Sequence, residues 1–299
     1  ASRITAVTSS AGDPPERIDS PEADIFEITL EAGAVVTYVA ERGSPLLPQL
    51  TLWTPDSYKD RLSRLTLYHG MVIGISGLLA LILTIAIVIR GALIFPAAAA
   101  LAWSVLAYIC VDFGFLGQLL KLTPEAARIY RAGSEVALAA TLVVFLFAYL
   151  NLNRWHVRYA HFTLGWVGLL VALIFLAWYN PALVAGIARF SIGAIAVIGF
   201  VLIVYLATHG YDRAVLLIPT WLLLLIWVAG IGFILLGRLQ DELAPVIAVG
   251  VIVILVMLVG FTVMQHAFSS GVLSHALVSE SERKALALNG SGDSVFDWD

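Results

Sequence analysis

Long apolar runs dominate the chain from Thr66 to His266, and only short polar breaks separate them. A helix needs about 20 mainly apolar residues to cross the hydrocarbon core of a bilayer. Seven runs reach that length: 66–90, 95–117, 125–150, 160–179, 182–208, 213–237 and 243–266. The composition agrees, because 60% of the residues are hydrophobic and 13% are charged, against roughly half and a quarter in soluble domains. The sequence therefore predicts a mainly α membrane protein with a seven-transmembrane helix bundle at 61–266.

Turn signals separate even the closest of these runs. Asn180 precedes Pro181, and Thr123 precedes Pro124. Asn and Thr are good N-cap residues, and proline fits the first position of a helix. We therefore expect new helices to begin at Pro181 and at Pro124, which supports seven spans.

The first 60 residues are of a different kind. Phe26, Ile28 and Leu30 alternate with polar residues, and a second β-rich run follows at 35–40. Such alternation is typical of strands, and further strands are expected at 3–8 and 49–53. Three or four strands without a helix predict part of a β-sandwich at 1–60. Because so small a sandwich would be marginal alone, we expect a longer protein with more strands before Ala1.

The residues after the last span predict a connection to another domain. Residues 267–286 carry a broken apolar stripe and are expected to form a cytoplasmic connecting helix, with a solvated linker as the alternative. At 287–299 the chain contains Gly292-Asp293, Phe296 and Asp297-Trp298. This pattern resembles the first strand of a PAS domain.

The order of these parts, together with three short stretches, resembles one family of bacterial receptors. The stretches are 33–39, 50–53 and 67–74. They are similar to the seven-transmembrane receptors with diverse intracellular signalling modules (7TMR-DISM). The resemblance implies a jelly-roll-like periplasmic sensor, whose C-terminal strands would be residues 1–60, and a multi-pass domain in the bacterial inner membrane.

The same resemblance implies a function in signal transduction. The receptor would pass a periplasmic or membrane signal to a PAS-linked output outside this chain, with cyclic-di-GMP synthesis or hydrolysis favoured over a histidine kinase. Residues 1–299 then hold no catalytic site, although the full-length protein would be an enzyme. Because such outputs act as paired subunits, a homodimer is expected. The partner would be a periplasmic ligand or an envelope protein, and an envelope scaffold is the alternative function.

The Lys and Arg residues of the short loops indicate the orientation. If residues 1–65 lie outside, the cytoplasmic segments hold six basic residues and the outer loops hold four. Cytoplasmic loops are enriched in Lys and Arg, and the turn at 151–158 carries Arg154 and Arg158. We therefore expect a periplasmic N-terminus and a cytoplasmic C-terminus.

Four charged residues lie within the predicted spans. A charge at the bilayer centre costs about 2.5–3.5 kcal/mol on insertion scales, so such residues need a reason. Asp112 lies toward the outer end of the second span, Arg131 and Glu135 lie one turn apart in the third, and Arg189 lies about two turns into the fifth. Their similar depth predicts one network. It would form either the bottom of a ligand cavity or switch, or a structural lock between three helices.

Glycines recur at helical spacing in several spans. Gly70, Gly74 and Gly77 share one face of the first span, and Gly193 and Gly199 lie in the fifth. Small residues allow membrane helices to approach closely. We expect these faces to pack inside the bundle rather than against a second copy.

No pattern indicates a metal or a cofactor. Several histidines lie near the predicted cytoplasmic ends of spans, but no two have a tight ligand spacing on one helix; they are His156, His161, His209 and His266. Cys110 is the single cysteine, so an intrachain disulfide is excluded. It is expected to be a small buried apolar residue.

Other classes of membrane protein fit less well. A retinal protein needs a lysine in the seventh span for its Schiff base, and the only lysines are Lys59, Lys121 and Lys284. A transporter usually has broken helices or an internal repeat around a midplane site. A membrane hydrolase needs a nucleophile or a metal constellation at one face. The sequence has neither pattern, and it lacks the Lys/Arg runs expected of a nucleic-acid-binding protein.

Overall fold

The computed structural model describes residues 4–9, 15–18, 25–29, 33, 35–42, 52–89, 93–152, 157–235 and 244–269. The chain divides into two compact units, at 1–64 and 65–299. The predicted PAS segment at 287–299 lies outside the described residues, as does the predicted connecting helix beyond residue 269.

The second unit is a helical membrane bundle. Within the described residues, seven helices are long and apolar enough to cross a membrane, as the sequence predicts. They are α1 (Pro55–Ile89), α2 (Ile94–Asp112), α4 (Pro124–Leu150), α5 (Val157–Leu176), α6 (Pro181–Thr208), α7 (Asp212–Leu235) and α8 (Ala244–Ser269). The chain is therefore a multi-pass membrane protein.

The predicted helix starts are confirmed at two caps. The Thr123 hydroxyl accepts a hydrogen bond from the Ala126 amide at 3.3 Å, where α4 begins. The Asn180 side chain accepts one from the Leu183 amide at 3.2 Å, where α6 begins. Each cap satisfies one of the amides that a helix N-terminus leaves without a partner.

The second span is shorter than predicted. We expected it to continue to residue 117, but α2 ends at Asp112, and a separate short helix, α3, covers Phe115–Leu119. Gly114 lies between them with φ 70°, in the left-handed region. That conformation is readily accessible to glycine and interrupts an α-helix. The break places Asp112 at a helix terminus rather than inside a helix.

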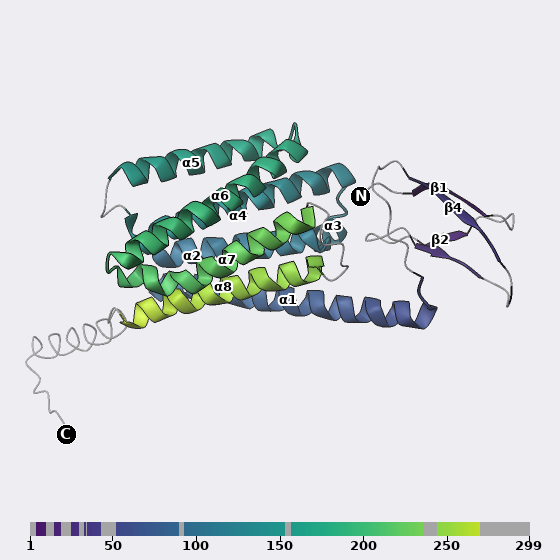
Figure 1. Cartoon of the computed structure of the whole chain (residues 1–299), viewed down its shortest axis with the longest axis horizontal. Coiled ribbons are helices and arrows are strands. Elements are labelled where there is room, and N and C mark those ends of the chain that lie inside the picture. The colour runs from purple at the N-terminus through teal and green to yellow at the C-terminus, as the bar shows by residue number, and fades with distance from the viewer. Residues whose placement is uncertain are drawn as a thin grey trace, which may run out of the picture. The chain divides into compact units, whose positions relative to one another are not determined.

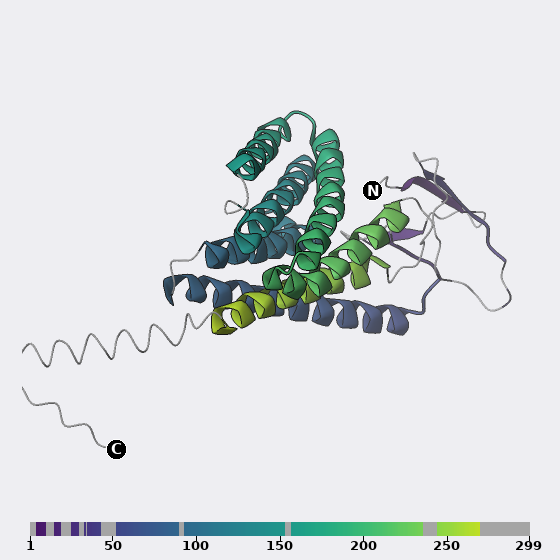
Figure 2. The same ribbon diagram turned by 60° about the vertical axis from the view of Figure 1, so that its left-hand side comes forward.

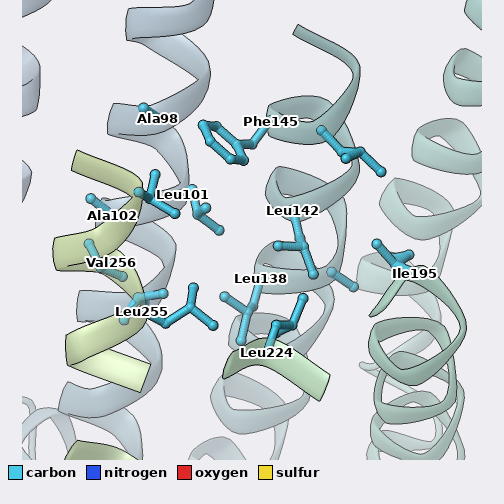
Figure 3. Packing of buried hydrophobic residues seen from close by; sticks show 14 of the residues in the cluster. Ala98, Leu101, Ala102, Leu138, Leu142, Phe145, Ile195, Leu224, Leu255 and Val256 are labelled. Carbon is cyan, nitrogen blue, oxygen red and sulfur yellow. The ribbon is translucent and has the colours of Figure 1, made fainter. Parts of the chain in front are cut away.

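Five of the helices form a closed ring. Around it, α2 packs on α4, α4 on α6, α6 on α7, α7 on α8, and α8 on α2. Figure 3 shows side chains from all five ring helices meeting in the core, including Leu101, Leu138, Ile195, Leu224 and Val256. The ring is therefore the packing unit that fixes the positions of polar groups between its members.

The other two long helices lie outside this ring. In Figures 1 and 2, α5 lies at the edge of the bundle beside α4 and α6, and α1 runs alongside α8. A hydrogen bond of 2.7 Å from the Tyr68 hydroxyl to the Val246 carbonyl joins α1 to α8. A second bond, of 3.0 Å from Trp103 Nε1 to the Thr84 hydroxyl, joins α2 to α1.

The expectation that the glycine faces pack inside the bundle is wrong for α1 and right for α6. A Cβ atom at Gly70, Gly74 or Gly77 would have no heavy atom of a neighbouring element within 4 Å, so this face is not packed inside the bundle. Gly199 behaves as expected, because a Cβ there would lie 2.6 Å from Nε1 of Trp221 on α7. Spacing on one helix identifies a face that another helix can approach, but the packing of the whole bundle decides which face is used.

Residues 1–64 include four short strands before α1 begins at Pro55. They are β1 (Ile4–Ser9), β2 (Glu16–Ile18), β3 (Ile25–Glu27) and β4 (Tyr38–Arg42). β1 pairs antiparallel with β4, and β2 pairs antiparallel with β3, so the described strands make two separate two-stranded sheets. Strands predicted at 3–8, 26–30 and 35–40 are present with shifted ends, and β2 was not predicted. The predicted strand at 49–53 is wrong in its described part, because 52–53 lie outside any strand.

Candidate functional site

The four charged residues singled out in the spans meet at one end of the ring. We call this the Asp112 end, where α2 ends and where α4, α6 and α8 begin. Arg131 Nη2 donates a hydrogen bond to Asp112 Oδ1 at 2.7 Å. Arg189 donates two hydrogen bonds to Glu135, from Nε to Oε2 at 2.9 Å and from Nη2 to Oε1 at 2.8 Å. The fork of the guanidinium matches the two carboxylate oxygens, which is the strongest geometry for such a pair.

Glu135 joins the two ion pairs into one network. Its Oε1 also lies 3.7 Å from Arg131 Nε, one turn earlier on α4. The order is therefore Asp112, Arg131, Glu135, Arg189, with alternating signs and a formal sum of zero. Only 4% of the Glu135 side chain is exposed, so its charge depends on the two guanidinium groups for stabilisation.

Helix geometry explains why these side chains meet. Arg131 and Glu135 are four residues apart and therefore lie on one face of α4. That face is directed toward α2 on one side and α6 on the other, since α4 packs on both. Arg189 follows the Asn180 cap by about two and a half turns, which brings it to the level of Glu135. The sequence predicted the common depth, and the structure supplies the partners.

A cavity of about 360 Å³ lies against this network. Its described lining residues come from every helix of the five-helix ring, and none of them belongs to α1 or α5. The lining residues are Tyr108, Asp112, Arg131, Glu135, Arg189, Trp227, Ile231, Ile234, Ala248 and Val249. One wall is charged and the opposite wall is mostly apolar, a combination typical of small-ligand sites.

Sequence reasoning missed the residues that connect this cavity to α8. Trp227 on α7 lines the cavity, and its Nε1 donates a 2.7 Å hydrogen bond to the Ala248 carbonyl on α8. Two residues earlier on α8, the Val246 carbonyl accepts the bond from Tyr68. Both contacts lie inside uniformly apolar runs, where periodicity does not mark any single tryptophan or tyrosine. The only available signal was that a Trp N–H in lipid requires an acceptor.

The charged side chains of the cavity can bind a polar ligand through hydrogen bonds and charge. Both carboxylates of the network already accept hydrogen bonds from arginine, and none of the described lining residues is a serine, a cysteine or a histidine. Among the described residues, no three His, Cys, Asp or Glu side chains form a group that could hold a metal ion. His156 lies outside the described residues.

No protein-family model, no curated protein and no solved structure matches the chain. A function for the protein must therefore be argued from the residues and contacts described above.

Proposed function

We propose that this protein is a transmembrane signal-transduction receptor that detects a ligand at the Asp112 end of its bundle. One observation supports the proposal: Trp227, a cavity-lining residue of α7, is hydrogen-bonded to the first turns of α8. Because α8 is the last described helix, a change at the cavity is transmitted to the helix that leads toward the C-terminus.

The physical requirement for such a receptor is a difference in ligand affinity between two positions of α8. A ligand shifts a conformational equilibrium only by the difference between its affinities for the two states. In this cavity a ligand would contact Trp227, Ala248 and Val249 together. Its binding energy therefore depends on the position of α8 relative to α7.

The output and the location in the cell rest on the resemblance of the sequence. We propose a PAS-linked output that makes or degrades cyclic-di-GMP, in a bacterial inner-membrane protein that works as a homodimer. Purification of the native-length protein from its own membranes, followed by mass spectrometry, distinguishes the classes. A bound small molecule supports the receptor, whereas a stoichiometric envelope protein supports a scaffold.

Trp227→Phe in the native-length protein tests the connection to α8. We expect cellular cyclic-di-GMP to change at least about twofold, because an aromatic ring remains but the hydrogen bond from the indole to the Ala248 carbonyl is lost, and such a bond contributes about 1 kcal/mol. Trp166→Phe is the matched control. Its Nε1 is buried without a partner among the described residues, so we expect no change in output. An unaltered response in a well-folded Trp227→Phe protein would count against the proposal.

The orientation has its own test. In a Cys110→Ser background, the Tyr38→Cys and His156→Cys variants are treated in cells with a thiol reagent that does not cross the inner membrane. We expect labelling of the Tyr38→Cys variant only, because the basic residues of the short loops favour the cytoplasm for the turn at 151–158. Labelling at position 156 and not at position 38 would reverse the orientation.

A further inference from the structure

We infer that the cavity at the Asp112 end binds a small organic monocarboxylate, with its carboxylate on the two arginines and its apolar body on α7 and α8. Such a ligand would be the signal of the receptor proposed above, so its biological role rests on that function. Its binding, however, is measurable without any output.

Hydrogen-bond counting identifies the charge of the ligand. A guanidinium group has five N–H donors and no acceptor. Arg189 gives two of them to Glu135, and Arg131 gives one to Asp112. Three donors on Arg189 and four on Arg131 thus make no hydrogen bond to the described residues, although Arg131 Nε lies 3.7 Å from Glu135 Oε1. On the acceptor side, each carboxylate has about four acceptor positions on its two oxygens, so Glu135 with two bonds and Asp112 with one keep about five between them, against the seven donors. The network has a surplus of donors, which favours an anion.

Exposure of the four side chains agrees with this count. Arg131 is 51% exposed and Arg189 is 38% exposed, whereas Asp112 is 20% and Glu135 is 4% exposed. All four side chains line the cavity, and the two positive groups are more accessible than the two negative groups. A cationic ligand would meet the guanidinium groups first, and like charges repel strongly at short range in a low dielectric.

The other wall determines the body of the ligand. Trp227, Ile231, Ile234 and Val249 provide an aromatic and aliphatic surface. A volume of about 360 Å³ is near the lower end of the range of ligand cavities. A single carboxylate on a small apolar or aromatic body fits these walls. A second carboxylate would add another negative charge to a network whose formal charges already sum to zero, so a dianion fits less well than a monocarboxylate.

The first experiment compares three molecules of nearly equal shape. Phenylacetate, phenylacetamide and phenethylamine are titrated by calorimetry into the purified full chain in nanodiscs. We expect phenylacetate to bind at least about tenfold more tightly than phenylacetamide, because only the carboxylate forms charge-assisted hydrogen bonds with arginine. We expect no binding of phenethylamine. Equal affinity for acid and amide, or no binding of the acid, would overturn the inference.

Two substitutions with opposite expected effects locate the binding. Arg131→Gln should weaken phenylacetate binding at least about tenfold, and Asp112→Asn should strengthen it about threefold, because it removes the carboxylate that competes for Arg131. Arg128→Gln is the matched control, since Arg128 is an exposed arginine one turn earlier on α4. Asp112→Asn keeps the test decisive even if the arginine variant does not fold. Weaker binding by the Asp112→Asn protein would contradict the inference.

The carboxylate site and the receptor function can be rejected independently of each other. Tight phenylacetate binding without any change in cyclic-di-GMP would leave the carboxylate site intact and would count against the receptor function. A Trp227-dependent output in a protein that binds no carboxylate would support the receptor and reject this ligand class.

Discussion

Glu135→Gln is expected to lower the free energy of unfolding of the bundle by about 3 kcal/mol. The substitution keeps the size of the side chain but removes its charge. Arg189 then loses the carboxylate that accepts two of its hydrogen bonds, and a charged group is left without compensation in low dielectric. The expected loss is near the lower end for buried pairs, because Arg189 is 38% exposed.

Thermal unfolding in detergent and the yield of membrane-inserted protein measure this effect. The double variant Glu135→Gln with Arg189→Met removes both charges together, so it should be more stable than the Glu135→Gln protein. Glu125→Gln is the matched control, because Glu125 is exposed in the first turn of the same helix. Additive losses in the double variant would show that the two residues do not form an energetically coupled pair.

Gly199→Ala is expected to destabilise the bundle by about 2–3 kcal/mol. A Cβ atom there would lie 2.6 Å from Trp221 Nε1 and 2.8 Å from its Cε2. Trp221 cannot move aside at little cost, because it is 1% exposed and its Nε1 donates a 3.1 Å hydrogen bond to the Ala196 carbonyl. Either the ring is displaced and the bond is lost, or α6 and α7 separate.

Gly193 on the same helix provides the control for this prediction. A Cβ there would lie 3.7 Å from Val228 Cγ1, which is an ordinary van der Waals distance. Gly193→Ala should therefore unfold at or slightly above the temperature of the unsubstituted protein, since alanine is the better helix former. Equal unfolding temperatures for the two alanine variants would mean that α6 and α7 are not closely packed at Gly199.

The sequence was most informative wherever the bilayer constrains the chain. Apolar length predicted the seven spans, and the Thr123 and Asn180 signals predicted two helix starts. The cost of a charge in lipid identified all four members of the network. These properties depend on single residues or short segments, so they can be recognised before the helices are packed together.

Contacts between helices required the folded structure. Asp112, Arg131, Glu135 and Arg189 share a depth, but depth does not say that Arg189 pairs with Glu135 and Arg131 with Asp112. The cavity and the Trp227 bond depend on how five helices close a ring. Likewise, the three glycines on α1 form a more regular small-residue pattern than Gly199 does. Of these four glycines, however, only Gly199 is in close contact with a tryptophan side chain of a neighbouring helix.

The short strands were harder to delimit for another reason. β3 has three residues and β4 has five, and segments of this length contain too few alternations to fix their ends. β4 also includes Glu41 and Arg42, which lie beyond the end of the run predicted at 35–40. Pairing with β1 keeps these charged residues in the strand, because backbone hydrogen bonds between strands do not depend on polarity of the side chains.

The length of α1 has a mechanical consequence. Its 35 residues extend about 52 Å, whereas the hydrocarbon core is about 30 Å thick. The helix is therefore longer than a single crossing needs, and the part of it from Leu65 onward belongs to the helical unit and begins about one turn before the tyrosine that is bonded to α8. A shift of α1 along its own axis would reach α8 through the bond from Tyr68 to the Val246 carbonyl. A movement of α1 and a molecule bound in the cavity would thus act on the same turns of one helix.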